Sequence, residues 1–161
     1  MEAIRKNFWK NGWTVIRSRQ RLLSVKLRKD MDLHGLHVLL AEDNDLNAEI
    51  AVSLLEEQGM IVTRAADGKS ALIQFCNTAP GTFDLILMDI MMPEMNGYET
   101  TKAIRNLPDR PDGKEIPIIA MTANAFAEDV QAALDAGMDD HVAKPMDMDI
   151  LISAIEKCVK R

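Results

Sequence analysis

The chain has 161 residues, 47% hydrophobic and 27% charged, which is the composition of a globular protein with room for one domain and an extension. Two cysteines, Cys76 and Cys158, exclude a disulfide scaffold and a cysteine-rich zinc module, and no run approaches the roughly 20 apolar residues of a membrane span. No export signal is recognisable, so we expect a cytoplasmic location.

The charge is unevenly distributed along the chain, and the net value of -6 conceals this. Residues 1–30 carry nine Lys or Arg and two acids, a net +7, whereas ten bases and 23 acids leave residues 31–161 at -13. We therefore predict a basic N-terminal extension or linker over residues 1–35 and a folded domain over residues 36–161. An acidic domain lacks the basic face that nucleic acids require, so no specific nucleic-acid partner is expected.

From His37 onward, short apolar runs alternate with segments of helical periodicity. The runs, whose continuous apolarity is typical of parallel strands covered on both faces, lie at residues 38–41, 61–62, 85–88, 118–121 and 142–143. Apolar residues spaced three or four positions apart predict helices around residues 46–55, 71–75, 98–107, 130–134 and 151–158.

Details within this pattern give further expectations. In the first helix, the apolar face is expected to contain Leu46, Ile50 and Leu54, with Ala51 and Leu55 beside them. Residues 108–114 are typical of a surface loop. Pro117 has no backbone N–H, so we place it at the start of the fourth strand.

Five strands, each followed by a helix, predict an α/β fold with a parallel sheet, helices on both faces and right-handed crossovers. Ligands of such sheets bind at the carboxyl ends of the strands. The second run is followed only by Arg64 and Ala65. The other four runs are followed by chemically capable side chains, namely Glu42 and Asp43, Asp89, Thr122, and Lys144.

Each of these residues alone has an ordinary structural interpretation. The acid pair and Thr122 suit helix caps, Asp89 suits a turn, and Lys144 suits a solvated loop. Their convergence at one edge of the sheet favours a site instead, because neighbouring carboxylates repel one another unless a cation is present. Oxygen ligands without His or Cys indicate Mg²⁺, with Mn²⁺ as the alternative ion.

An ammonium and a hydroxyl beside such a cation suit the oxygens of a phosphoryl group. No Ser-His or Cys-His pair is suggested, so a carboxylate is the expected nucleophile, and the central one is Asp89. Aspartyl phosphates are an established class of covalent intermediate. The residues therefore predict phosphoryl transfer to Asp89.

The motifs around these residues resemble the receiver domain of two-component response regulators. They occur in the family's order over residues 36–160, and they are LAEDN at 40–44, LMDIMMPEMNG at 87–97, MTA at 121–123 and AKP at 143–145. The phrase DHVAKP at 140–145 is most similar to receivers of hybrid histidine kinases. The resemblance implies a flavodoxin-like (βα)5 doubly wound fold, with a five-stranded parallel sheet in the order 2-1-3-4-5.

The resemblance also implies roles at the metal site. Asp89 would accept a phosphoryl group from a phosphohistidine on a histidine kinase or a histidine phosphotransfer protein. Asp43 and Asp89 would bind Mg²⁺ directly together with the backbone carbonyl of Met91, and Glu42 would act mainly through water. Met91 and Asn124 stand where the family tunes dephosphorylation.

Three further residues would respond to the phosphoryl group. Thr122 would donate a hydrogen bond to it, and Lys144 would pair with its charge. His141 stands at the switch position, which is often Tyr or Phe in the family, and this departure leaves the aromatic switch in doubt. The Lys144–Pro145 peptide bond is expected to be cis, an uncommon state for X–Pro bonds.

Phosphorylation adds up to about two negative charges. We expect it to switch a surface of this chain, formed by strand 4, strand 5 and helix 5, that binds a downstream protein partner. The protein would thus be a signalling phosphoacceptor rather than an enzyme, catalysing only its own phosphotransfer and dephosphorylation. Two alternatives stay open. One is a Mg²⁺-dependent aspartyl-phosphate phosphatase, which usually needs a second acid where Met91 stands; the other is a degenerate docking module.

Residues 1–30 match no family that we can name. Trp9, Trp13, Ile16, Gln20, Leu23 and Leu27 are spaced as on one stripe of a helix. Three interpretations stay open: a connector or dimerisation helix, a membrane-surface helix with basic flanks, and a disordered basic segment. Of these, membrane contact is disfavoured.

Overall fold

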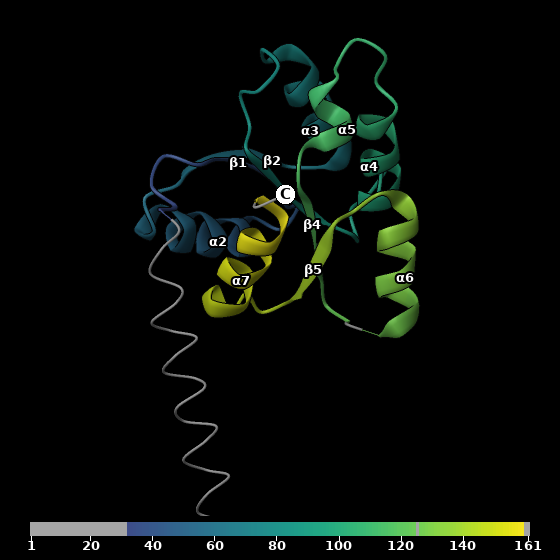
Figure 1. The fold of residues 1–161 in the computed structure, drawn as a ribbon. Coiled ribbons are helices and arrows are strands. Elements are labelled where there is room, and N and C mark those ends of the chain that lie inside the picture. Colours follow the sequence, from purple (N-terminus) through teal and green to yellow (C-terminus); the bar gives the residue numbers. More distant parts are fainter. Residues whose placement is uncertain (1–31, 125, 160–161) are drawn as a thin grey trace, which may run out of the picture. The chain divides into compact units, whose positions relative to one another are not determined.

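The computed structural model describes residues 32–124 and 126–159, which contain one five-stranded parallel sheet (Figure 1). The strands run in the order β2-β1-β3-β4-β5, which confirms the predicted doubly wound fold. Their bounds are β1 (His37–Ala41), β2 (Ile61–Ala65), β3 (Leu85–Asp89), β4 (Ile118–Thr122) and β5 (Asp140–Ala143).

Helices cover both faces of this sheet. Their bounds are α2 (Asp45–Glu57), α3 (Gly68–Asn77), α4 (Gly97–Arg105), α5 (Asp112–Glu115), α6 (Ala127–Ala136) and α7 (Met148–Val159). Helix α4 packs between α3 and α6, and Figure 1 shows α2 and α7 together on the other side of the sheet. Among the described residues, no helix combines the length and the apolarity needed to span a membrane.

The core lies along the central strands. Every residue of β3 and β4 is buried, as the continuous apolar runs predicted. The largest side chains of the core, such as Leu87, Ile119 and Phe75, are fully buried. Since burying one such side chain stabilises a protein by roughly 1.5–3 kcal/mol, this core forms a rigid base for the strand ends.

Two local expectations were wrong. Residues 108–114, predicted as a loop, contain the start of the four-residue helix α5. The guanidinium of Arg110, which precedes this helix, pairs with its first residue, Asp112, at 2.8 Å. In α2 the buried residues are Ala48, Ala51 and Leu55, whereas Leu46 and Ile50 are exposed. Because alanine side chains are small, this face of α2 can lie close to the sheet. The face that carries the larger Leu46 and Ile50 side chains therefore points outward.

The ends of the helices are fixed by specific side chains. Asn44 caps α2 by accepting from the Asn47 N–H at 2.9 Å, and Asn96 forms a capping box with Glu99 at the start of α4. Both caps directly follow the loops that carry the predicted site residues.

Pro117 lies just before β4 instead of opening it, and its carbonyl accepts from Ile86 N–H at 2.9 Å.

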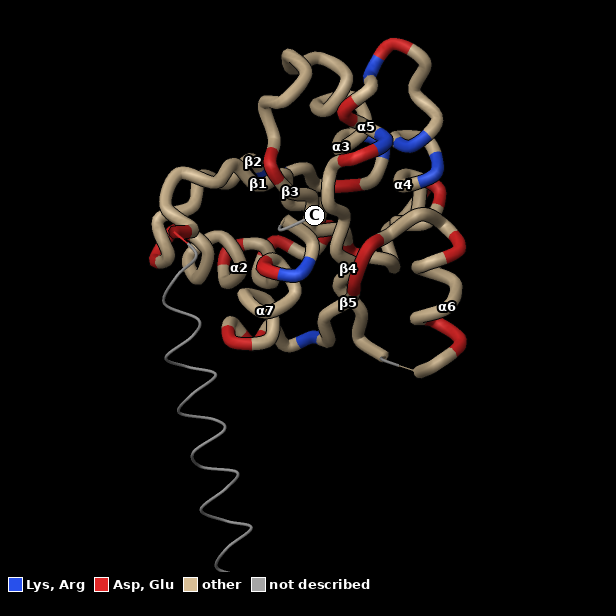
Figure 2. Tube along the Cα trace, viewed as in Figure 1, with Lys and Arg blue, Asp and Glu red and all other residues tan. Residues whose placement is uncertain are grey.

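The chain divides between residues 32 and 33. The three interpretations of residues 1–30 lie outside the described residues. Among the described residues, acidic side chains are spread over α2, α6 and the start of α7, while basic ones gather around α4 and α5 (Figure 2).

Candidate functional site

The carboxyl edge of the sheet brings together side chains from β1, β3, β4 and β5. Asp89 and Thr122 are the last residues of β3 and β4, while Glu42 and Lys144 directly follow β1 and β5. The parallel register pairs Ala41 with Met88 and Asp89 with Met121, so the strand ends lie level with one another. This arrangement is the one expected from the apolar runs.

Three carboxylates form one cluster at this edge. Glu42, Asp43 and Asp89 each offer an oxygen, and these oxygens lie within 4.8 Å of one another. Glu42 and Asp89 are buried, at 2% and 4% exposure, whereas Asp43 is exposed to solvent. A cluster of oxygen donors with one open side can hold a metal ion, and this donor set fits a hard divalent cation.

The electrostatics of Asp89 also favour a bound cation. Burial, followed by the negative charge of Glu42, raises the pKa of the Asp89 carboxyl to about 6, although Lys144 opposes this rise. Two buried acids beside each other are thus only partly neutralised by the protein's own groups. A divalent cation at the three oxygens would remove the remaining repulsion.

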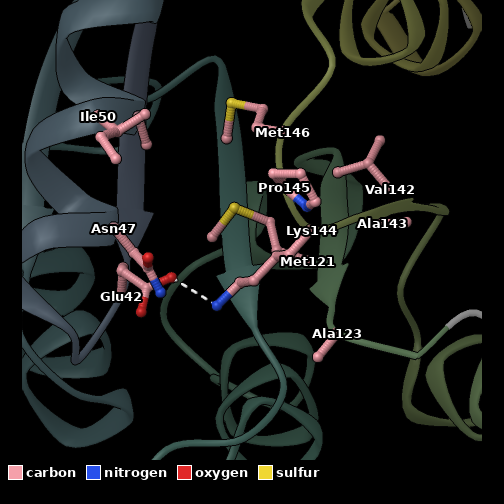
Figure 3. A pocket seen from close by; sticks show the side chains of 11 residues that line it. Glu42, Asn47, Ile50, Met121, Ala123, Val142, Ala143, Lys144, Pro145 and Met146 are labelled. Carbon is pink, nitrogen blue, oxygen red and sulfur yellow. Dashed lines mark hydrogen bonds and ion pairs between the residues drawn. The ribbon is translucent and has the colours of Figure 1, made fainter.

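Lys144 is the internal cation of the cluster. Its Nζ lies 2.6 Å from Oε2 of Glu42 (Figure 3). The same Nζ lies 3.1 Å from Oδ2 of Asp89. Burial alone would lower the pKa of Lys144, but the hydrogen bond to Glu42 and the charge of Asp89 outweigh it and hold the pKa above its ordinary value. The Lys144–Pro145 bond is cis, which confirms that expectation.

The loop after β3 closes tightly around Asp89. The Met91 N–H lies 3.3 Å from Oδ1 of Asp89 and donates to it, and the Gly97 N–H donates to the Ile90 carbonyl at 2.9 Å. A Cβ on Gly97 would collide with the Asp89 carbonyl oxygen, so only glycine permits this approach. The side chain of Met91 points to solvent, at 78% exposure.

Thr122 is engaged locally. Its hydroxyl donates to the Asn124 carbonyl at 2.6 Å and accepts from the Asn124 N–H at 3.1 Å. His141 lies in β5 opposite Ala120, two positions before Thr122, and its ring nitrogen Nδ1 lies 3.7 Å from Asp140. The structure therefore places Thr122 at the edge and His141 further along the sheet.

A pocket of about 370 Å³ adjoins the cluster (Figure 3). Its polar side is formed by Glu42, Asn47 and Lys144. Its apolar lining includes Ile50, Met121 and Met146. The exposure of Ile50 on α2 follows from this position, since its side chain faces the pocket instead of the core.

One contributor to the site escaped the sequence analysis. Arg64 of β2 donates to the Glu42 carbonyl from Nη2 at 3.2 Å and pairs with Asp45 at 2.6 Å. Its only signal in the sequence was its place at the end of the second apolar run. The sheet order puts that end beside β1, and this neighbour was implied only by the family resemblance.

The chain belongs to the response regulator receiver domain family, whose sequence profile matches residues 38–156. Over 128 residues, or 80% of the chain, it is 41% identical to the aerobic respiration control sensor protein ArcB of Escherichia coli. The matched segment is 16% of ArcB, and the chain spans less than a fifth of the length of several other histidine kinases that it matches.

Solved structures show the same relationship. The receiver domain of the sensor histidine kinase PA1611 from Pseudomonas aeruginosa, which has a magnesium ion in its active-site cleft, is 35% identical with a TM-score of 0.70 over 79% of this chain and 99% of that one. The receiver of Saccharomyces cerevisiae Ssk1, solved with the phosphotransfer protein Ypd1, is 27% identical with a TM-score of 0.67 over 79% and 90%.

Proposed function

We propose that this receiver is a Mg²⁺-dependent phosphoacceptor in two-component or phosphorelay signalling, with Asp89 as the residue that is phosphorylated. The observation that carries the proposal is the convergence of three carboxylates and Lys144 at one edge of the sheet. A metal site and a nucleophilic carboxylate are the parts that phosphoryl transfer needs. The magnesium ion in the PA1611 receiver supports this choice of cation.

The proposed reaction transfers a phosphoryl group from a phosphohistidine. An Asp89 carboxylate oxygen attacks phosphorus, the P–N bond breaks, and the imidazole nitrogen keeps the bonding electron pair. Asp43, Asp89 and the Met91 carbonyl would hold Mg²⁺, with Glu42 acting through water, and the bound ion would supply positive charge against the phosphoryl oxygens. Lys144, which already contacts Asp89, pairs with the charge that arrives there.

The proposed switch begins at Thr122. Its hydroxyl gives up the Asn124 carbonyl and donates to a phosphoryl oxygen, which draws the β4–α6 loop toward Asp89. The surface formed by β4, β5 and α7 is the proposed face for a downstream protein partner, with His141 in place of the usual aromatic switch residue. Met91 and Asn124 are proposed to set the rate of dephosphorylation.

The upstream partner is proposed to be a histidine kinase or a histidine phosphotransfer protein, as the likeness to ArcB and to the Ssk1 receiver supports. The protein would turn over no external metabolite. A phosphatase with an aspartyl nucleophile is less well supported, because Met91 has no proton to deliver to a leaving group. The proposed location is cytoplasmic.

The proposal is tested by incubating the chain with Mg²⁺ and phosphoramidate and measuring its intact mass. Wild type should gain the mass of one phosphoryl group. Chelating Mg²⁺ before the reaction should abolish this gain. Asp89→Asn should gain none, and Asp109→Asn, which changes an exposed acid away from the cluster, should match wild type. A receiver that dephosphorylates itself also releases phosphate from excess phosphoramidate, so the result that would favour the phosphatase is sustained hydrolysis of a phosphate monoester.

A further inference from the structure

A single side chain of β2 is bound to both ends of the turn that carries Glu42 and Asp43. Nη2 of Arg64 donates to the Glu42 carbonyl at 3.2 Å and to Oδ1 of Asp45 at 2.6 Å. Nε of Arg64 lies 3.4 Å from the same carbonyl oxygen. The guanidinium therefore spans the turn from the residue after β1 to the first residue of α2.

The sheet holds Arg64 in the place from which it reaches this turn. Arg64 pairs with Leu40 in the parallel register of β1 and β2, and the Glu42 N–H donates to the Ala65 carbonyl at 3.1 Å. The carbonyl of Arg64 accepts from Gln74 Nε2 at 3.1 Å. Both the strand and α3 thus fix the backbone from which the guanidinium projects.

The two contacts of the guanidinium differ in character. Asp45 is 92% exposed, and an ion pair of that kind contributes little to stability. The contact with the Glu42 carbonyl, by contrast, orients the peptide plane that directly precedes Asp43. This plane sets the direction in which the Asp43 side chain leaves the backbone.

Asp43 depends on its backbone more than the other two acids do. The Glu42 carboxylate is held by the Asn44 N–H at 3.1 Å and by Lys144 at 2.6 Å, and Asp89 is buried in the core. Asp43 is exposed, so packing does not fix its carboxylate. We propose that Arg64 is a positioning residue for the metal site, which orients Asp43 by holding the Glu42–Asp43 peptide plane.

This inference rests on the proposed function, because it needs a Mg²⁺ site. The test asks whether removing Arg64 tightens or weakens Mg²⁺ binding. Arg64 brings positive charge near the carboxylates, so if it acted only through charge, removing it would tighten Mg²⁺ binding. If it positions Asp43, removing it weakens binding in spite of the more negative surroundings.

The experiment measures Mg²⁺ affinity by isothermal titration calorimetry of the full chain, for wild type, Arg64→Gln, Arg64→Lys and the control Lys69→Gln. Loss of an outer partner of a metal ligand commonly lowers affinity about tenfold, and we expect about that loss in Arg64→Gln. Arg64→Lys keeps the charge but not the fork of donors, so it should also weaken binding. Lys69→Gln removes an exposed cation that is not bound to this turn and should leave affinity equal or slightly higher.

Circular dichroism and the thermal midpoint show whether each variant is folded at the titration temperature. Arg64→Lys retains the charge, and it decides the matter if Arg64→Gln does not fold. Wild-type affinity or tighter binding in a folded Arg64 variant, even with a lowered midpoint, overturns the positioning role and leaves the proposed function intact. A wild-type chain that binds no Mg²⁺ overturns both.

Discussion

Nζ of Lys144 lies 2.6 Å from Oε2 of Glu42, although 102 positions of sequence separate the two residues. The same ammonium reaches Asp89 at 3.1 Å, so one lysine neutralises part of the charge of two buried acids. A Mg²⁺ ion bound at the acid cluster would therefore compete with Lys144 for the same carboxylates. This competition gives the first prediction.

Replacing Lys144 with Met should tighten Mg²⁺ binding and lower stability when Mg²⁺ is absent. Two charges 4 Å apart interact by about 4 kcal/mol at an effective dielectric constant of 20. If a third of this interaction energy, about 1.4 kcal/mol, becomes available to Mg²⁺ when Lys144 is removed, the affinity for Mg²⁺ should rise about tenfold. Calorimetric titration and thermal denaturation with and without Mg²⁺ measure both effects.

The matched control is Lys102→Met, which removes an exposed lysine from α4. It should leave Mg²⁺ affinity and the metal dependence of the thermal midpoint unchanged. Equal affinities for Lys144→Met and wild type would show that Lys144 does not compete with the cation.

Gly97→Ala should damage the site as well as the fold. The new Cβ would collide with the Asp89 carbonyl oxygen and lie 2.9 Å from Cα of Ile90. Overpacking of this kind commonly costs about 1–3 kcal/mol, and here the backbone that must move carries Asp89. Urea denaturation should show the loss of stability, and phosphoramidate labelling should be slower.

Gly113→Ala provides the comparison, since its Cβ would lie 2.6 Å from the Ile104 carbonyl oxygen, away from Asp89. It should lower the free energy of unfolding by a similar amount and label at the wild-type rate below its thermal midpoint. Slow labelling in both variants would attribute the effect to general destabilisation.

Arg110 should stabilise the fold without affecting phosphorylation. The buried guanidinium donates to the Phe75 and Thr78 carbonyls, pairs with Asp112, and lies 4.2 Å from the centre of the Phe75 ring. Losing hydrogen bonds to a charged group commonly costs about 2 kcal/mol, so Arg110→Met should lower the free energy of unfolding by about that amount. Urea denaturation measures the loss of stability, and phosphoramidate labelling at low temperature measures phosphorylation. Labelling slower than that of wild type would contradict the expectation that phosphorylation is unaffected.

The Arg110–Asp112 pair should also make stability depend on pH. The hydrogen bond from Arg110 lowers the pKa of the Asp112 carboxyl to about 2, below the value of about 3.9 for an unfolded chain. The stabilisation is therefore full above about pH 4 and is lost as the pH falls toward about 2. At neutral pH, the free energy of unfolding measured by urea denaturation should be higher for wild type than for Asp112→Asn. This difference should shrink as the pH falls from about 4 to about 2. A difference that stays constant with pH would refute this linkage.

Thr122→Val should separate phosphorylation from its consequences. Valine keeps the shape of threonine but cannot donate to the Asn124 carbonyl or to a phosphoryl oxygen. Labelling of Asp89 should persist, while hydrogen exchange in β4, β5 and α6 should no longer change on phosphorylation. Thr122→Ser retains the hydroxyl and should preserve the change; an unaltered response in Thr122→Val would assign the switch to another residue.

The apolar runs were sufficient to predict β1, β3 and β4, because these strands are almost wholly buried and apolar on both faces. The edge strands β2 and β5 are only partly buried, and their runs are correspondingly short. Periodicity was less informative for α2, which carries two apolar stripes. It favoured Leu46, Ile50 and Leu54 with Ala51 and Leu55 beside them, and of these five only Ala51 and Leu55 are buried, together with Ala48. Periodicity also cannot reveal α5, whose four residues are too short to show a repeat.

The candidate site was predictable where it depended on strand ends, as with Asp89 and Lys144. Contacts that depend on sheet register and side-chain geometry were not predictable. The reach of Arg64 across to the Glu42 carbonyl is the clearest example. This contact arises only when β1 and β2 lie side by side.

The central claim is that Asp89 is the residue that forms the acyl phosphate. The most direct measurement is reduction of the phosphorylated chain with borohydride, which converts an aspartyl phosphate to homoserine, followed by mass spectrometry of its peptides. We expect homoserine at position 89 alone, formed only when Mg²⁺ is present during phosphorylation. Reduction at Glu42 or Asp43 instead, or a labelled chain with Asp89 unmodified, would contradict it.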